Sequence, residues 1–129
     1  MRQITTWDEF PTVEYVPGVY RQTVSGEKVM LTRIVYRGGV VIPEHTHPAE
    51  QLMLIEHGRL WAKVGDEESE LGPGSILVIP SDGVHAFRQL SEEDVVFYEA
   101  FAPIRLEYLI GYKGPDPSLG QIQRGIAGS

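Results

Sequence analysis

Three of the four histidines in this chain occur in two short segments where their spacing could bind a metal ion. In the first segment His45 and His47 are two residues apart, and side chains at that spacing point to the same face of an extended strand. The two rings could therefore share one ion, and imidazole nitrogen is a good ligand for Zn, Fe, Ni, Cu and Mn. Gln51 follows after a turn at Pro48 and offers an amide oxygen. The histidine spacing alone fits ordinary hydrogen-bonded side chains equally well.

The third histidine, His85, lies in a second segment that joins two predicted strands. An apolar run ends at Pro80, a turn follows, and His85 begins the next strand. Strand alternation places His85, Phe87 and Gln89 on one face, which we expect to point inward. The fourth histidine, His57, lies next to a turn glycine and is interpreted as an ordinary hydrogen-bonded side chain.

Short strands must position these side chains, because fourteen glycines and nine prolines divide the chain into short segments. In the run after Glu50, Gln51, Met53 and Ile55 share a face, so one polar group would lie above an apolar interior. Residues 13–24 could form one or two further strands. Many short strands separated by turn signals are typical of an all-β sandwich or barrel. Alternating or β-branched runs predict strands at residues 28–36, 50–56, 59–64, 75–79, 84–89 and 94–101.

The length and composition indicate a single domain that covers residues 1–129. Hydrophobic residues make up 42% of the chain, which suits a folded globular protein. The acidic clusters at residues 66–70 and 92–94 are predicted to be solvated loops or edge strands. Residues 114–129 are rich in glycine, proline and polar residues and are predicted to form a flexible, loosely ordered tail.

The charge and the missing residue types exclude several classes of function. The net charge is −7 and the pI about 5.0, so the chain has no electrostatic reason to approach a nucleic acid. It contains no cysteine, which excludes disulfides and thiolate zinc sites. Residues 1–11 lack the basic and apolar regions typical of a signal peptide, so we expect none, and no run of about 18 apolar residues could span a membrane. We therefore expect a soluble cytoplasmic protein with no nucleic-acid or membrane partner.

The two histidine segments resemble the paired sequence motifs of the cupin family. Gln51 falls where cupins usually carry a glutamate. The first motif, residues 39–58, is matched by two glycines and two histidines: Gly39, His45, His47 and Gly58. The second motif, residues 74–89, is matched by a glycine, a proline and a histidine: Gly74, Pro80 and His85.

The resemblance implies a cupin double-stranded β-helix, or jelly-roll barrel, around one divalent transition metal (Ni, Mn, Fe, Co or Zn). Glu50 is the alternative to Gln51 as a ligand, because it has the usual carboxylate but lies one residue out of register. Two departures from the second motif, Gly83 one place late and Gln89 for asparagine, do not touch a ligand. The implied ligands are His45, His47, Gln51 and His85.

A glutamine in place of the usual glutamate would change the chemistry of such a site. Three neutral imidazoles and a neutral amide leave the ion its full positive charge, so it should be a stronger Lewis acid. Four protein ligands on a six-coordinate ion would leave two positions open. That arrangement suits chelation of a hydroxy acid or a keto acid.

A carboxylate and a guanidinium lie near the end of the last predicted strand. Alternation places Glu99 on one face with Val95, Phe97 and Phe101, where burying a carboxylate is costly unless it is paired or functional. This face could point outward, Glu99 could pair with Arg105, or Glu99 could act as a general acid or base in the cavity. Arg105 could hold a substrate carboxylate with two parallel hydrogen bonds, or it could be a surface charge.

These features are similar to the small cupins that open unsaturated uronate rings in pectin and alginate degradation. In that subgroup the acid is usually an aspartate, and the roles of acid and carboxylate anchor would fall to Glu99 and Arg105. The resemblance implies a homodimeric, metal-dependent isomerase or ring-opening enzyme for a small carboxylated sugar or keto acid. The alternatives are an Fe(II)-dependent dioxygenase and a non-catalytic metal-binding, ligand-binding or sensor module.

Overall fold

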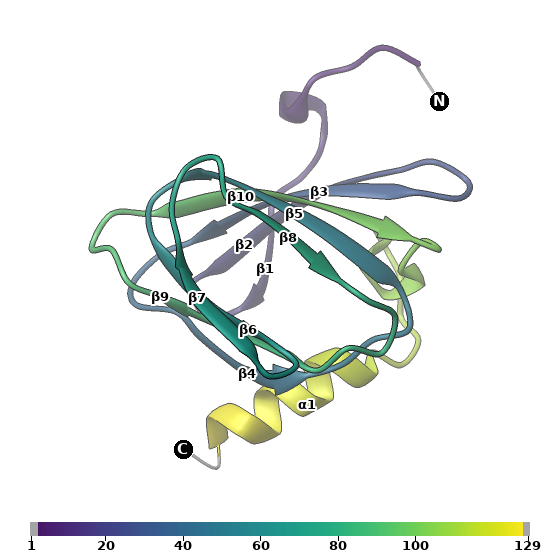
Figure 1. Cartoon of the computed structure of the whole chain (residues 1–129). Helices are drawn as coiled ribbons and strands as arrows, with labels where there is room; N and C mark the ends of the chain where they lie inside the picture. Colours follow the sequence, from purple (N-terminus) through teal and green to yellow (C-terminus); the bar gives the residue numbers. More distant parts are fainter. Residues whose placement is uncertain (1–2, 128–129) are drawn as a thin grey trace.

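The computed structural model describes residues 3–127 of the chain, which form mainly short strands (Figure 1). The predicted all-β fold is confirmed, and each of the six predicted strands agrees with an observed strand to within two residues at either end. None of the described helices is long and apolar enough to cross a membrane. In chain order the elements are η1 (Trp7–Glu9), β1 (Val13–Val16), β2 (Val19–Ser25), β3 (Met30–Tyr36), β4 (Val41–His45), β5 (Glu50–His57), β6 (Leu60–Val64), β7 (Glu67–Leu71), β8 (Ile76–Ile79), β9 (His85–Gln89), β10 (Val95–Ala102), η2 (Leu106–Tyr108) and α1 (Pro117–Ala127).

The strands form two antiparallel sheets that face each other and enclose the core (Figure 1). Among residues 3–127, one sheet has six strands in the order β1-β2-β3-β10-β5-β8, and the other has four in the order β4-β9-β6-β7. Neighbouring strands are often distant in sequence, as where β10 pairs with both β3 and β5. This crossing of the chain between two sheets is the jelly-roll arrangement expected from the histidine segments.

Strand alternation determines which side chains fill the barrel. Along β5, Gln51, Met53 and Ile55 are each 1% exposed, and the residues between them lie on the outer face. Strands β5 and β10 pair so that Glu99 lies opposite Met53 and Phe101 lies opposite Gln51. The register therefore brings a carboxyl group close to an amide inside the barrel. Along β10 the inward positions are Val95, Phe97, Glu99 and Phe101.

Two further segments of the sequence also form strands. Residues 13–24 fall in β1 and β2, which extend the six-stranded sheet beyond β3. The acidic cluster at residues 66–70 contributes most of β7, an exposed edge strand of the four-stranded sheet. Charged side chains on an edge strand discourage pairing with another chain, which explains why this strand can be so polar.

The prediction of a flexible tail is wrong for residues 117–127, which form α1 beside β4 (Figure 1). Asp116 precedes the helix and accepts a hydrogen bond from the backbone N–H of Leu119 at 3.0 Å. Ile122 is 3% exposed and packs into the barrel core. A short helix that contains glycines is marginal in isolation, so this packing is what stabilises it and composition alone does not reveal it. Residues 128–129 of the predicted tail lie outside the described residues.

Candidate metal centre

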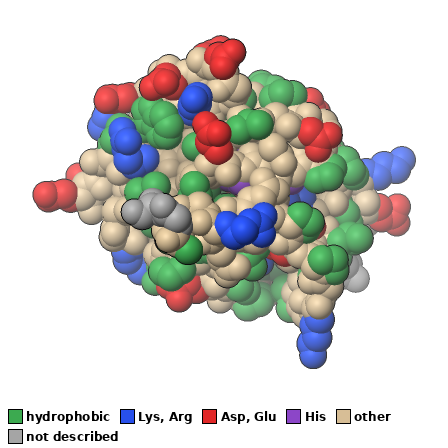
Figure 2. Space-filling model, turned by 90° about the horizontal axis from the view of Figure 1, so that it is seen from below, with side chains coloured by type: hydrophobic (Ala, Val, Ile, Leu, Met, Phe, Trp, Pro, Cys, Tyr) green, Lys and Arg blue, Asp and Glu red, His purple; other side chains and the backbone are tan. Residues whose placement is uncertain are grey.

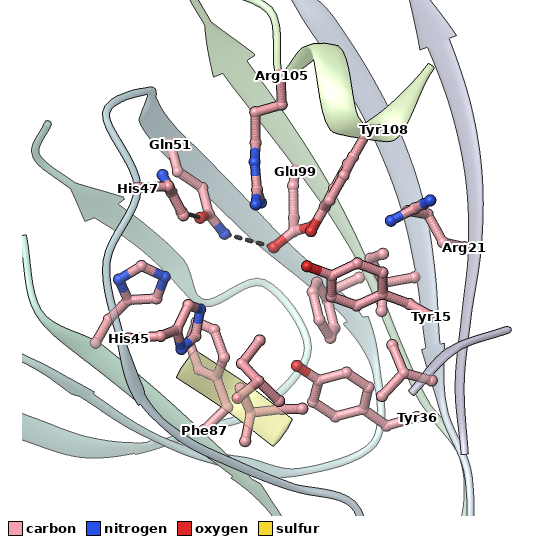
Figure 3. Close-up of a pocket in the computed structure, with 16 residues that line it drawn as sticks. Tyr15, Arg21, Tyr36, His45, His47, Gln51, Phe87, Glu99, Arg105 and Tyr108 are labelled. Atoms are coloured by element: carbon pink, nitrogen blue, oxygen red, sulfur yellow. Dashed lines mark hydrogen bonds between the residues drawn. The ribbon is translucent and has the colours of Figure 1, made fainter. Parts of the chain in front are cut away.

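A cavity lies inside the barrel and is lined by side chains from both sheets. In Figure 2, which looks from below the view of Figure 1, a histidine side chain is visible at the bottom of a hollow near the centre. Figure 3 shows the lining side chains converging on this space. The lining includes every site residue predicted from the sequence: His45, His47, Gln51, His85, Glu99 and Arg105.

The ends of two paired strands bring the three histidines together. His45 ends β4 and His85 begins β9, and the two residues lie opposite each other in the antiparallel pair. Their ring centroids are 4.1 Å apart. The His47 ring lies 4.8 Å from that of His85 and 6.3 Å from that of His45. All three side chains are buried, with His45, the most accessible, only 7% exposed.

Each of these histidines is oriented by a hydrogen bond from its Nδ1 to a backbone carbonyl two residues away. Because a carbonyl oxygen can only accept, Nδ1 must carry the proton, and in a neutral ring Nε2 then has a free lone pair. Metal-binding histidines are commonly oriented in this way through their second nitrogen. The acceptors are Pro43 at 2.8 Å from His45, Ala49 at 2.9 Å from His47, and Gly83 at 2.8 Å from His85.

Burial keeps the three rings neutral at physiological pH. Loss of solvent is the main cause that lowers the pKa of His45 and His47 to about 4 and the pKa of His85 to about 3. The positive charge of Arg105 acts in the same direction on all three. At pH 7 every Nε2 is therefore unprotonated, which is the form that binds a metal.

Gln51 adds an oxygen atom to this group. Its Oε1 lies 3.0 Å from Nε2 of His47, and its amide N–H donates to Oε2 of Glu99 (Figure 3). Since His47 carries its proton on Nδ1, Oε1 and Nε2 face each other with lone pairs and no proton between them. A cation bound to both atoms would relieve this contact, so the donor set fits a metal ion. Within residues 3–127, histidine, cysteine, aspartate and glutamate alone form no group of three able to hold an ion, so a site here would also need the Gln51 amide oxygen.

Strand register distinguishes Gln51 from its alternative. Gln51 is 1% exposed and faces the histidines, whereas Glu50 is exposed on the outer face of β5. His57 is exposed at the far end of the same strand, where its Nδ1 donates to the carbonyl of Asp94 and its Nε2 lies 3.3 Å from Glu93. Neither Glu50 nor His57 lines the cavity.

Two of the three expectations for Glu99, an outward position and a pair with Arg105, are wrong. Glu99 is 7% exposed and points inward, where its Oε1 accepts a hydrogen bond from the Thr32 hydroxyl at 3.0 Å and its Oε2 accepts from Gln51. Arg105 forms its ion pair with Glu107 instead, at 2.7 Å from Nε. Burial raises the pKa of Glu99 to about 7, against the opposing effect of these hydrogen bonds and of nearby arginines. The carboxyl group therefore populates both protonation states near neutral pH.

Several residues that surround Arg105 were not found by the sequence reasoning. The Arg105 guanidinium stacks on the ring of Tyr108 at 4.0 Å, and its Nη2 has no hydrogen-bond partner among the described residues. Tyr15, Arg21 and Tyr108 line the same cavity. Arg21 shares the inward face of β2 with buried Val19, so strand alternation could have indicated it. Tyr15 and Tyr108 lie in segments without a clear pattern, and only the fold places them.

Two facing antiparallel sheets in jelly-roll order, with three histidines and a glutamine inside the barrel, define the cupin class of β-barrel protein. The cupin-domain family model matches residues 32–101, more than half of the chain, and the chain belongs to the cupin family. The matched residues include both histidine segments and Glu99. The expected family and fold are thereby confirmed.

Individual relatives agree with this assignment. The chain is 29% identical over 101 residues to the polyketide synthase CurC of Streptomyces cyaneus; the match covers 78% of this chain and 60% of that protein, so the chain spans about three fifths of its length. Among solved structures, KdgF from a Halomonas species is similar with a TM-score of 0.77 at 23% identity, covering 84% of this chain and 100% of that chain. An RmlC-like cupin from Shewanella frigidimarina has a TM-score of 0.77 at 16% identity, covering 84% and 97%. At these identities the two structures support the fold.

Proposed function

We propose that this cupin is a metal-dependent enzyme that isomerises or ring-opens a small carboxylated sugar of the uronate type, or a related keto acid. The observation that carries the proposal is that one cavity combines three kinds of group. These are the three histidine rings with the Gln51 amide oxygen as potential metal ligands, the Glu99 carboxyl with a pKa of about 7, and the Arg105 guanidinium, whose Nη2 has no hydrogen-bond partner among the described residues. Buried polar groups with perturbed pKa values are costly to fold and are typical of functional sites.

The three histidines and Gln51 would hold one divalent transition metal. When bound, the ion would polarise a carbonyl or ring oxygen of the substrate. The ligand set of three imidazoles and one amide is compatible with Ni, Mn, Fe, Co and Zn. Glu99 supports the site indirectly, because it accepts the amide hydrogen bond that turns the Gln51 oxygen toward His47.

Glu99 would transfer the proton. An isomerisation removes a proton at one position of the substrate and returns one at another, so it needs no oxidant and no second substrate. It does need a group that can both accept and donate a proton near neutral pH. Glu99 meets this requirement through its pKa of about 7, and Thr32 and Gln51 hold the carboxyl in place.

Arg105 would anchor the substrate carboxylate. Its Nε is already bonded to Glu107, and the rings of Phe101 and Tyr108 lie 5.0 and 4.0 Å from its Cζ. These contacts fix the plane of the guanidinium and leave Nη2 available. A hydrogen bond from a buried guanidinium to a carboxylate contributes orientation as well as affinity.

The metal requirement can be measured directly. Elemental analysis should find about one transition metal per chain, which the His45→Ala/His47→Ala variant loses and the His57→Ala control keeps. Calorimetry should then show that uronate-type ligands bind only the metal-loaded protein. Equal binding to protein treated with a chelator would refute the scheme.

The variant Glu99→Gln separates an enzyme from a binding module, because glutamine can still accept hydrogen bonds but cannot carry the proton. An enzyme should lose turnover by about 10²–10⁴-fold and keep its affinity for the ligand. An unchanged rate would exclude Glu99 as the proton carrier. Oxygen uptake by the Fe(II)-loaded protein with a diketone or an aromatic diol would instead favour the dioxygenase alternative.

We also propose that two copies of the chain associate through the outer face of the six-stranded sheet. Leu31, Leu52 and Val78 are exposed and lie in register across β3, β10, β5 and β8, next to exposed Leu54 and Ile76. A contiguous apolar band is typical of an interaction surface. A second copy of the chain would place the same uncharged band against this one, so the net charge of −7 on each chain would lie outside the contact. Leu54→Glu should then convert a dimer to a monomer in analytical ultracentrifugation. A monomeric wild-type protein would refute this proposal.

A further inference from the structure

We propose that the cavity binds a ligand with two anionic groups, one at Arg105 and the second at Arg21, on the two sides of Tyr108. The first position rests on the proposed function, in which Arg105 anchors a carboxylate. The second position is an additional anchor, and within the proposed function it favours a keto acid with two carboxylates over a uronate, which has only one. The chemical class is a short dicarboxylic acid that carries a keto or hydroxy group for the metal side of the cavity.

Both arginines are buried cations with a nitrogen that lacks an acceptor. Arg21 lies on the inward face of β2 and is 8% exposed, and its Nη1 has no hydrogen-bond partner among the described residues. Arg105 is 5% exposed, and within the same part of the chain its Nη2 also lacks a partner. Buried polar atoms are normally hydrogen-bonded, because leaving a donor unpaired costs free energy. Two such nitrogens on one cavity indicate that a ligand supplies their acceptors.

Tyr108 holds the two guanidinium groups at a defined separation. The Cζ atoms of Arg21 and Arg105 lie 3.9 and 4.0 Å from its ring centroid, and Figure 3 shows the ring between them. The two Cζ atoms are therefore within about 8 Å of each other. Arg21 also stacks on Tyr15 at 4.7 Å, and the Tyr15 hydroxyl donates to Asp116 at 3.0 Å. The rings contact the flat faces of the cations, whereas the N–H groups point outward in the guanidinium plane and still need acceptors.

The charges inside the cavity favour an anion at each arginine. Among the described residues that line the cavity, Glu99 carries the only carboxyl group, and Thr32 and Gln51 already donate hydrogen bonds to it. Both guanidinium groups stay fully charged. Arg105 keeps its ion pair with Glu107, whereas Nη1 of Arg21 has no acceptor among the described residues, so a second anionic group on the ligand would be attracted most strongly to Arg21.

The separation of the arginines sets the length of the ligand. A carboxylate that receives hydrogen bonds from a guanidinium lies about 4 Å from Cζ, so two carboxylates on a chain of about four to six carbons can reach both arginines. Such a ligand would place one carboxylate beside Glu99 and Arg105 and the other beyond the edge of the Tyr108 ring. A monocarboxylate of equal length would leave Arg21 without its acceptor.

A matched pair of ligands tests this inference on the full-length protein loaded with metal. The probes 2-oxoglutarate and 2-oxopentanoate share the keto-acid end and differ in the second carboxylate. Calorimetry should show that 2-oxoglutarate binds about 10–100-fold more tightly. Arg21→Gln should reduce this preference to within about threefold and leave the affinity for 2-oxopentanoate nearly unchanged. Arg88→Gln, the same charge change on an exposed residue of β9, should leave the preference intact.

The outcomes separate this inference from the proposed function. Equal affinity of the wild-type protein for the two acids would overturn the second anionic position and leave the proposed function standing. An unchanged preference in Arg21→Gln would overturn the role of Arg21. Arg21→Lys keeps the positive charge and should retain part of the preference, so it tests the same point if the glutamine variant folds poorly. Failure of both acids to bind would overturn the inference together with the keto-acid form of the proposed function.

Discussion

Replacing Glu99 by glutamine should change how the stability of the metal-free protein depends on pH. Burial raises the pKa of Glu99 from 4.5 to about 7 in the folded protein. Between pH 4.5 and 7 the folded state therefore keeps a proton on Glu99 that the unfolded chain has released, so the contribution of Glu99 to wild-type stability falls as the pH rises through this window. Glutamine does not ionise, and the variant should lack this loss.

The size of the effect follows from the pKa shift. A shift of about 2.5 units at 1.36 kcal/mol per unit corresponds to about 3 kcal/mol. Little of this is screened by water, because Glu99 is only 7% exposed. The free energy of unfolding of Glu99→Gln, minus that of the wild-type protein, should therefore increase by about 3 kcal/mol between pH 4.5 and pH 8. Its value at pH 4.5 depends on how well the amide replaces the protonated carboxyl beside Thr32 and Gln51.

Urea unfolding of both proteins at several pH values in the presence of a chelator measures this difference. Glu50→Gln is the matched control, because Glu50 is exposed on the outer face of β5. Its free energy of unfolding, minus that of the wild-type protein, should vary by less than about 0.5 kcal/mol over the same pH range. If the same difference for Glu99→Gln also did not change with pH, burial would not raise the pKa of Glu99. A cation next to Gln51 would favour the carboxylate, so the same series on metal-loaded protein should show a smaller change.

Three further predictions concern the histidines, α1 and a turn glycine. The buried rings stay neutral while histidines in the unfolded chain take up protons as the pH falls. The free energy of unfolding of the metal-free protein should therefore fall by about 1.4 kcal/mol per pH unit for each site histidine between pH 6.5 and 4. His85→Gln should make this slope shallower in urea unfolding, and an unchanged slope would contradict the pKa shifts. Ile122→Ala should cost about 2–4 kcal/mol in urea unfolding, whereas a negligible loss would mean that α1 does not pack into the core. Gly58→Ala should lower the melting temperature more than Gly74→Ala. Both glycines have a positive φ, which an alanine adopts only with strain. An added Cβ at Gly58 would also lie 2.6 Å from the carbonyl oxygen of Asp94, whereas one at Gly74 would meet nothing within 4 Å. Equal melting temperatures would show that the backbone at Gly58 can relax.

Much of the barrel and of the candidate metal centre could be predicted because both depend on local patterns. Alternation of side chains along a strand placed Gln51 inside and Glu50 outside, and it put Glu99 on one face with Val95, Phe97 and Phe101. The spacing of His45 and His47 put both rings on one face. Turn residues marked where strands end, which located His85 at the start of β9. These features need only a few neighbouring residues to be recognised.

The C-terminal helix shows where local patterns fail. Its glycines, proline and polar residues are typical of a tail, and the segment is too short to be a stable helix by itself. It forms because Ile122 finds a place in a core built by residues far away in the sequence. The favourable free energy comes from that packing, which composition does not contain.

The sequence by itself determined which side chains can face the interior of this protein, because the two-residue period of a strand is a local property of the backbone. Only the tertiary structure decided which of those side chains meet. Glu99 contacts Thr32 and Gln51 because β10 pairs with both β3 and β5, and Thr32 is its direct partner in that register. Arg105 turns to Glu107 and, through Tyr108, faces Arg21. The contacts of Glu99 with Thr32 and Gln51, and of Tyr108 with Arg21, join segments that are distant in the chain. Their free energy depends on how the whole barrel closes rather than on any short stretch of residues.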